Sequence, residues 1–228
     1  MYKFIFTLLL CCSCLAKSWG QSNQALRDSL AKATDALAYH PDSIDLRLKK
    51  VAWNIQLEQW NYAKDDLDKV LYLSPNNIAG LYYRAFVNER MGRLNFSRLD
   101  YEHLLTLVPG NFEGQLGLAL LNQKSKRYTE AFDQINSLVN QFPNNAVAYA
   151  ARGGIEKERG LLELAIFDFS EAIRRDPKNK DYLLNRVDLL IATKQSEAAI
   201  RDLEQLVRLG VNRSSLSNLY KQARKIAK

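Results

Sequence analysis

The chain has 228 residues, of which 47% are hydrophobic and 25% are charged. This length suits one ordinary domain or one short repeat array, and the composition excludes an intrinsically disordered chain. The net charge of +7 is unevenly placed, since residues 1–20 contribute +2, residues 213–228 contribute +5 and residues 21–212 sum to zero. A nucleic-acid-binding protein spreads basic residues over a face, so nucleic acid is not an expected partner.

Residues 1–20 have the three parts of a secretory signal peptide. Lys3 supplies a positive charge, residues 4–16 are mainly apolar, and Ser18 and Gly20 are small residues suited to a cleavage site before Gln21. The apolar stretch is shorter than the roughly 20 residues that span a bilayer. We therefore expect cleavage after Gly20 and an exported protein, either periplasmic or secreted.

All three cysteines, Cys11, Cys12 and Cys14, lie within this signal. The mature chain is thus expected to have no disulfide, no cysteine nucleophile and no cysteine metal ligand. The alternative is a membrane-anchored lipoprotein, because bacterial lipoproteins carry an acylated cysteine at the end of such an apolar stretch. Cys12 has Leu9 three residues before it and Cys14 has Ser13 directly before it, so each meets one of the two usual requirements.

A period of 34 residues runs through the rest of the chain. All five prolines follow it, at Pro41, Pro75, Pro109, Pro143 and Pro177. Two further columns share it. Small residues recur at Ala63, Ser97, Ala131, Ala165 and Ala199. Bulky residues recur at Leu67, Tyr101, Ile135, Phe169 and Leu203.

Each period contains two amphipathic stretches at helical spacing, separated by a turn that Gly92 and Gly160 mark. Proline ends the second helix, because it cannot continue the helical hydrogen bonding. Two residues after each proline stands a residue that can cap the next helix. These predicted caps are Ser43, Asn77, Asn111, Asn145 and Asn179.

These columns resemble the tetratricopeptide repeat family, whose period is about 34 residues. The clearest unit spans residues 146–177 and contains Gly153, Gly160, Ala165 and Phe169. The resemblance covers nearly all of residues 21–228. It implies an all-α fold, a right-handed α-solenoid of helix–turn–helix repeats. The expected order is a half-repeat or capping helix at 21–43, repeats at 44–77, 78–111, 112–145, 146–179 and 180–213, and a C-terminal capping helix at 214–228.

In this family the first helix of each repeat lines a concave groove that binds ligands. The resemblance therefore assigns groove positions to Leu48, Ile55, Tyr82, Phe86, Glu89, Arg90, Leu116, Leu120, Lys124 and Lys157. Large apolar side chains among them favour a bound peptide or helix, and packing between neighbouring repeats is the equal alternative. One version of the family grips a partner's C-terminal carboxylate, but apolar or small residues stand at those positions here, so that mode is not expected.

A third pattern is the recurrence of Asn54, Asn88 and Asn122 in the first helices. Such a row can bond to a ligand backbone, although buried amides more often bond to one another or to water.

Nothing indicates an enzyme. The two histidines, His40 and His103, lack metal-ligand spacing, and no nucleotide-binding motif occurs. No catalytic residue, cofactor or metal site is expected.

The sequence therefore predicts a non-catalytic scaffold of the bacterial cell envelope that binds another protein, and a monomer is expected. Two alternatives stay open. One is a lipid-anchored assembly factor for an outer-membrane or secretion complex, similar in architecture to the pilotins of pilus secretins. The other is a regulatory subunit of an envelope enzyme. Membrane contact is expected only if Cys12 or Cys14 is lipidated.

Overall fold

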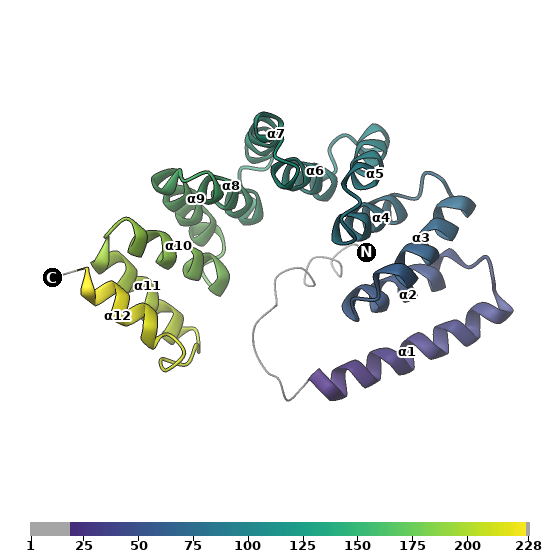
Figure 1. The fold of residues 1–228 in the computed structure, drawn as a ribbon, viewed down its shortest axis with the longest axis horizontal. Helices are drawn as coiled ribbons and strands as arrows, with labels where there is room; N and C mark the ends of the chain where they lie inside the picture. The colour runs from purple at the N-terminus through teal and green to yellow at the C-terminus, as the bar shows by residue number, and fades with distance from the viewer. Residues whose placement is uncertain (1–18, 227–228) are drawn as a thin grey trace. The chain divides into compact units, whose positions relative to one another are not determined.

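The computed structural model describes residues 19–226, which form twelve α-helices and no strand (Figure 1). The predicted all-α class is confirmed. The helices are α1 (Trp19–Tyr39), α2 (Ile44–Gln56), α3 (Trp60–Leu73), α4 (Ile78–Arg90), α5 (Leu94–Leu107), α6 (Phe112–Lys124), α7 (Tyr128–Gln141), α8 (Ala146–Glu158), α9 (Leu162–Arg175), α10 (Lys180–Ala192), α11 (Ser196–Arg208) and α12 (Ser217–Lys225). The signal peptide up to Ser18 and the lipidation sites at Cys12 or Cys14 lie outside the described residues.

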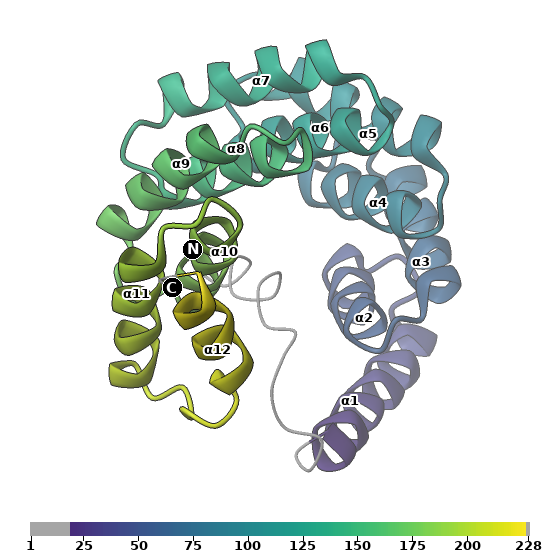
Figure 2. The same ribbon diagram turned by 60° about the vertical axis from the view of Figure 1, so that its left-hand side comes forward.

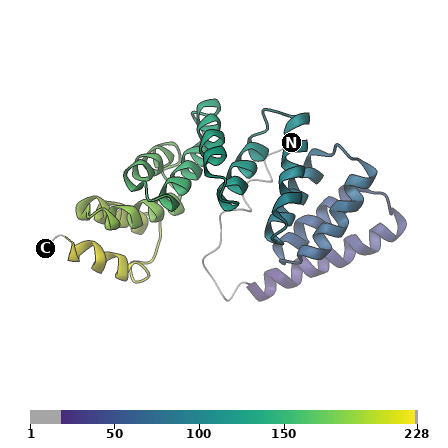
Figure 3. The same cartoon turned by 45° about the horizontal axis from the view of Figure 1, so that its top comes forward.

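The chain divides into two compact units, and the border falls after Leu121, inside α6. In the first unit α1 packs on α2, α2 on α3, α3 on α4 and α4 on α5 (Figures 2 and 3). In the second unit α7 packs on α8, followed by α9, α10 and α11 in turn, and α12 covers α11 and α10. Each helix thus packs mainly on its neighbours in sequence, as in repeat arrays.

The helices follow the 34-residue period of the sequence. The first helices of the five pairs begin at Ile44, Ile78, Phe112, Ala146 and Lys180. The predicted caps are confirmed, because each side chain accepts a hydrogen bond from a backbone N–H in the first helical turn. Where a proline follows a helix of the array, that helix ends two residues before it, as at Leu73 and Pro75.

The turn inside each pair needs one residue in the left-handed region. Gly92 and Gly160 take it at φ 73° and 74°, as their place in the sequence suggests. The equivalent residues of the other pairs are not glycine: Glu58, Lys126 and Lys194 have φ of 55°, 60° and 61°. A side chain in this conformation costs about 1 kcal/mol, so three of the five turns are strained.

The periodic columns form the core. The small residues at Ala63, Ser97, Ala131, Ala165 and Ala199 have no exposed surface. Because they are small, the paired helices approach closely, and the bulky column fills the space beside them. Leu67, Tyr101, Ile135, Phe169 and Leu203 are all buried. Burial of these residues stabilises each repeat only when its neighbours are stacked on it.

Both end helices differ from their predicted bounds. The first was expected within residues 21–43, and α1 runs from Trp19 to Tyr39 in the described part. The last was expected at 214–228, and α12 runs from Ser217 to Lys225. Its start is late because the side chain of Asn212 accepts two hydrogen bonds from Ser214, which hold the residues before Ser217 in turns. Leu216 and Ala223 are buried, as a cap over the last repeat requires.

Candidate functional site

The predicted groove residues divide between the two units. Lys124 and Lys157 belong to the second unit, and the other eight belong to the first. On α2 and α4, Leu48, Ile55 and Phe86 are partly buried against a core of Val51, Ala63, Leu67 and Val87. These three side chains therefore serve the core of the first unit with one side and face solvent with the remainder.

Aromatic contacts fix the two large side chains of α4. The ring of Phe86 meets Trp60 edge-on at 6.2 Å, and the guanidinium of Arg90 lies 5.1 Å from its centre on the next turn. Tyr82 meets the rings of Tyr83 and Tyr101 edge-on at 5.6 and 6.2 Å. Burial, with a smaller effect of Glu113, raises the pKa of Tyr82 to about 12, so its hydroxyl stays neutral.

Leu120 on α6 is the most open apolar residue of the predicted set, with 41% of its surface exposed, whereas Leu116 is partly buried. In the described part of the chain, other large apolar side chains with at least a third of their surface exposed lie on α1, on second helices or at the caps of those helices. They are Tyr39, Tyr62, Tyr72, Phe96, Leu99, Leu107, Val108, Tyr128, Leu161, Leu164 and Phe167.

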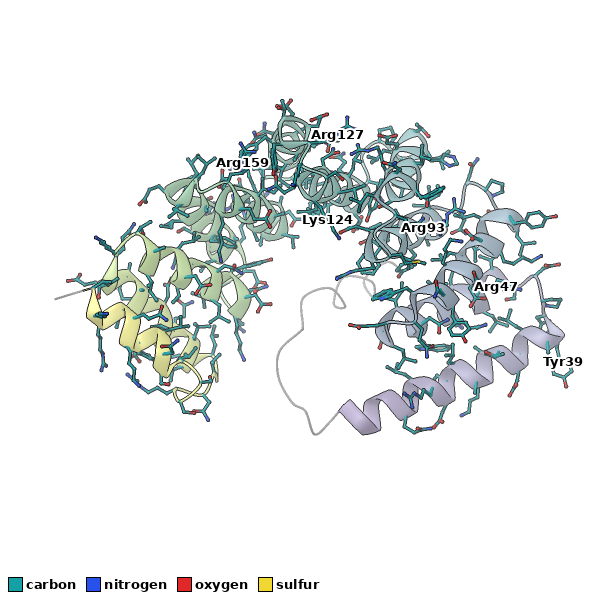
Figure 4. All side chains as sticks on the ribbon, in the orientation of Figure 1. Tyr39, Arg47, Arg93, Lys124, Arg127 and Arg159 are labelled. Carbon is teal, nitrogen blue, oxygen red and sulfur yellow. The ribbon has the colours of Figure 1, made fainter. Side chains whose placement is uncertain are left out.

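Charged groups of the predicted set behave differently in the two units. Arg90 is exposed and forms no ion pair among the described residues; its contact there is the ring of Phe86. Lys124 is exposed in the last turn of α6 (Figure 4). Lys157 lies 3.3 Å from the side-chain oxygen of Asn185 and 3.5 Å from the carboxylate of Asp188. Its charge is therefore partly neutralised by α10.

A set of arginine–aspartate pairs, which the sequence reasoning missed, joins the two helices of several repeats. The forks of Arg84, Arg152 and Arg186 each donate two hydrogen bonds to an aspartate sixteen residues later, at 2.6–2.9 Å: these are Asp100, Asp168 and Asp202. Each arginine also donates to the second helix of the preceding repeat, at Asp68, Asn136 or Ser170.

The signal that identifies these pairs is the same 34-residue period. At the equivalent positions the first repeat has Lys50 and Asp66, which pair at 3.2 Å, and the third has Leu118 and Gln134. Asp66 also accepts a hydrogen bond from Arg47 at 2.9 Å (Figure 4). Because the acids of these pairs are buried, the arginines stabilise the repeats and are not available to a ligand.

The asparagine row is structural. Asn54, Asn88 and Asn122 are 1%, 3% and 1% exposed, which leaves no surface for a ligand. Asn88 donates to Asp100 at 3.4 Å, and Asn122 donates to Gln134 at 2.7 Å. The residue one period later is not an amide but Glu156, which is also buried. Asn88 and Asn122 therefore join the two helices of their repeats.

Glu156 takes the place of an amide donor beside Asp168. Burial and the negative charge of Asp168 raise the pKa of Glu156 to about 8, although Arg152 acts in the opposite direction. Near neutral pH the carboxyl group is therefore mainly protonated. In this form it can donate a hydrogen bond to Asp168, as the amide of Asn88 does to Asp100.

The described residues show no arrangement that indicates chemistry at a metal. They contain no group of three or more histidine, cysteine, aspartate or glutamate side chains placed to hold an ion. The imidazole of His103 contacts Asn76 at 3.1 Å. Two depressions, lined by Gly92–Phe96 and by Gln141–Ala146, are open to solvent and each is formed by consecutive residues. In residues 19–226 no helix combines the length and apolar character needed to cross a bilayer.

Comparison with known proteins defines the fold. No protein-family model and no curated protein matches the sequence. A tetratricopeptide repeat protein from Parabacteroides merdae is similar in structure, with a TM-score of 0.74 and 19% identity over 91% of this chain and 81% of the other. The pilF protein of Pseudomonas aeruginosa is also similar in structure, with a TM-score of 0.64 and 16% identity over 80% of this chain and 88% of the other.

YrrB, a tetratricopeptide repeat protein with an unusual peptide-binding site, has a TM-score of 0.54 and 17% identity, over 85% of this chain and 97% of the other. At such identities the similarity establishes the fold and not the function. The chain has the α-solenoid fold of tetratricopeptide repeat proteins, as its proline and small-residue columns predicted.

Proposed function

We propose that this protein is a non-catalytic scaffold of the cell envelope that binds a peptide or helix of a partner protein on the first helices of its repeats. The contact of Arg90 with Phe86 supports this proposal best. In the first unit, α4 and α6 present part-exposed Tyr82 and Phe86, the exposed Leu120, and an arginine without a carboxylate partner among the described residues. A ligand with apolar side chains and a nearby acidic group fits such a surface.

The affinity would come from a preformed surface. Phe86 is held by Trp60 and by the core, so little side-chain order is lost when a ligand binds. The similarity to YrrB adds support, since that protein has a peptide-binding site on the same fold. The other predicted groove residues, Leu48, Ile55, Glu89, Leu116, Lys124 and Lys157, are proposed contacts of the same kind within their own units.

Site-specific crosslinking tests the proposal. A photoreactive amino acid is placed at Leu120 in the native host, and captured proteins are identified by mass spectrometry. Phe167 on α9 is a matched control, because it is apolar and 58% exposed but lies on a second helix. A protein captured at Leu120 but not at Phe167, and lost in the Phe86→Ala variant, supports binding to the first helices. Equal capture at both positions refutes it.

The envelope location depends on residues 1–20 and is a separate part of the proposal. An intact mass that starts at Gln21 without lipid supports a soluble exported scaffold. A lipid adduct at Cys12 or Cys14 supports the second candidate, a lipid-anchored assembly factor. An intact Met1 in the purified protein contradicts export. Size determination of the same sample tests the expected monomer.

A further inference from the structure

The C-terminal end of the second unit carries a concentrated positive charge that the proposed function does not use. From residue 205 to residue 226 the sequence contains five basic residues and no acidic residue. All five are exposed on α11, on α12 or between them. They are Arg208, Arg213, Lys221, Arg224 and Lys225. We call these residues the basic end.

Four of the five cations form no ion pair among the described residues, although the charge of Arg208 acts on the carboxylate of Glu204. Arg213 pairs with Glu204 at 2.9 Å, and Arg224 lies 5.8 Å from the ring centre of Tyr220. The acids of the helices packed against α12 are mostly engaged elsewhere in the second unit. Asp202 pairs with Arg186, Asp188 with Lys157 and Glu197 with Arg201, and Asp181 lies in the first turn of α10.

The basic end offers charge without apolar anchors. Along the chain, Phe167 is the last large apolar residue that is exposed in the described part. The apolar side of α12 is not available, because Tyr220 and Ala223 are buried in the core of the second unit. Protein interfaces take most of their binding energy from buried aromatic and apolar anchors. A surface of cations alone instead suits a partner that presents many anions at once and demands no fixed geometry.

We propose that the basic end docks on an anionic lipid bilayer, with the phosphate headgroups as its ligands. A lysine or arginine close to an anionic membrane contributes about 1 kcal/mol, which is about fivefold in partitioning. Four unpaired cations therefore give reversible adsorption. The contact is peripheral, since the apolar side of α12 packs on protein, and it weakens as salt screens the charges.

Vesicle co-sedimentation tests the proposal. The chain starting at Gln21 is used, so that apolar residues 4–16 do not contribute, with vesicles of phosphatidylcholine alone or with one third phosphatidylglycerol. The test variant replaces Lys221, Arg224 and Lys225 by Gln. The matched control replaces Arg27, Lys32 and Lys49 by Gln, which removes the same charge from exposed positions of the first unit. Circular dichroism confirms that both variants are folded.

We expect the protein to bind the vesicles that contain phosphatidylglycerol and not those of phosphatidylcholine alone. The partition coefficient of the test variant should fall by about 100-fold, because each of the three removed cations contributes about fivefold, and that of the control should change little. Equal losses in both variants, or equal binding to both vesicle types, would overturn the proposal. Binding of polyglutamate or duplex DNA without binding of vesicles would overturn it in favour of an anionic macromolecule. The assay does not involve the first helices, so its failure leaves the proposed function untouched.

Discussion

The protonated carboxyl of Glu156 gives the sharpest prediction. This side chain is 6% exposed and faces Asp168 of α9 and Arg152 of its own helix. Replacement by glutamine keeps the size, the neutral state and a donor for Asp168, but removes the titrating proton. We expect Glu156→Gln to be folded and to lose a dependence of stability on pH that the original protein has.

The sign follows from proton linkage. The folded pKa of Glu156 is about 8 and its ordinary value is 4.5, so the folded chain retains a proton that the unfolded chain releases between these values. Stability therefore decreases as pH rises through this window, by at most about 1.4 kcal/mol per pH unit. Because local rearrangement softens the cost of ionisation, we expect a total of about 1–3 kcal/mol between about pH 5 and pH 8.

Urea unfolding at several pH values measures this effect. The relevant quantity is the difference in unfolding free energy between Glu156→Gln and the original protein, because all other titrating groups cancel in it. That difference should increase in favour of the variant as pH rises to about 8. Glu197→Gln is the control, since the Glu197 side chain is 94% exposed. Parallel curves for Glu156→Gln and the original protein would refute the reasoning.

Three further predictions concern stability and can be measured by thermal or urea denaturation. Gly154→Ala should stabilise by about 0.5–1 kcal/mol, because the added Cβ meets open space in a helix interior. Gly117→Ala should destabilise by about 1–3 kcal/mol, because the added Cβ would lie 2.5 Å from the ring of Tyr101. Equal effects of the two substitutions would contradict this reasoning. Lys194→Gly should stabilise by about 0.5–1 kcal/mol by relieving a positive φ of 61°, and a loss would show that the turn is not strained. Arg186→Ala should cost about 2–4 kcal/mol, because it leaves buried Asp202 without its partner, and adding Asp202→Leu should recover part of the loss.

The candidate site was less predictable than the fold. The family's geometry assigned Tyr82 and Phe86 to a ligand surface, but their partial burial depends on Trp60 and Tyr101, which come from second helices. The same resemblance assigned Lys157 to the groove, and its nearness to Asp188 of the next repeat is a tertiary contact. The arginine–aspartate pairs were visible as a column in the sequence but have no meaning until the two helices are placed side by side.

The sequence by itself determined the helix boundaries and caps of the array, because proline, asparagine and small residues act through local backbone geometry and recur every 34 residues. It also supplies the expected signal peptide, which lies mainly outside the described residues. Only the tertiary structure decided which side chains are buried. Glu156 shows the reason. Its place in the sequence does not tell whether the acid is exposed or buried, and burial beside Asp168 makes it a neutral hydrogen-bond donor. Burial and charge pairing are sums over neighbouring helices, which no single helix encodes.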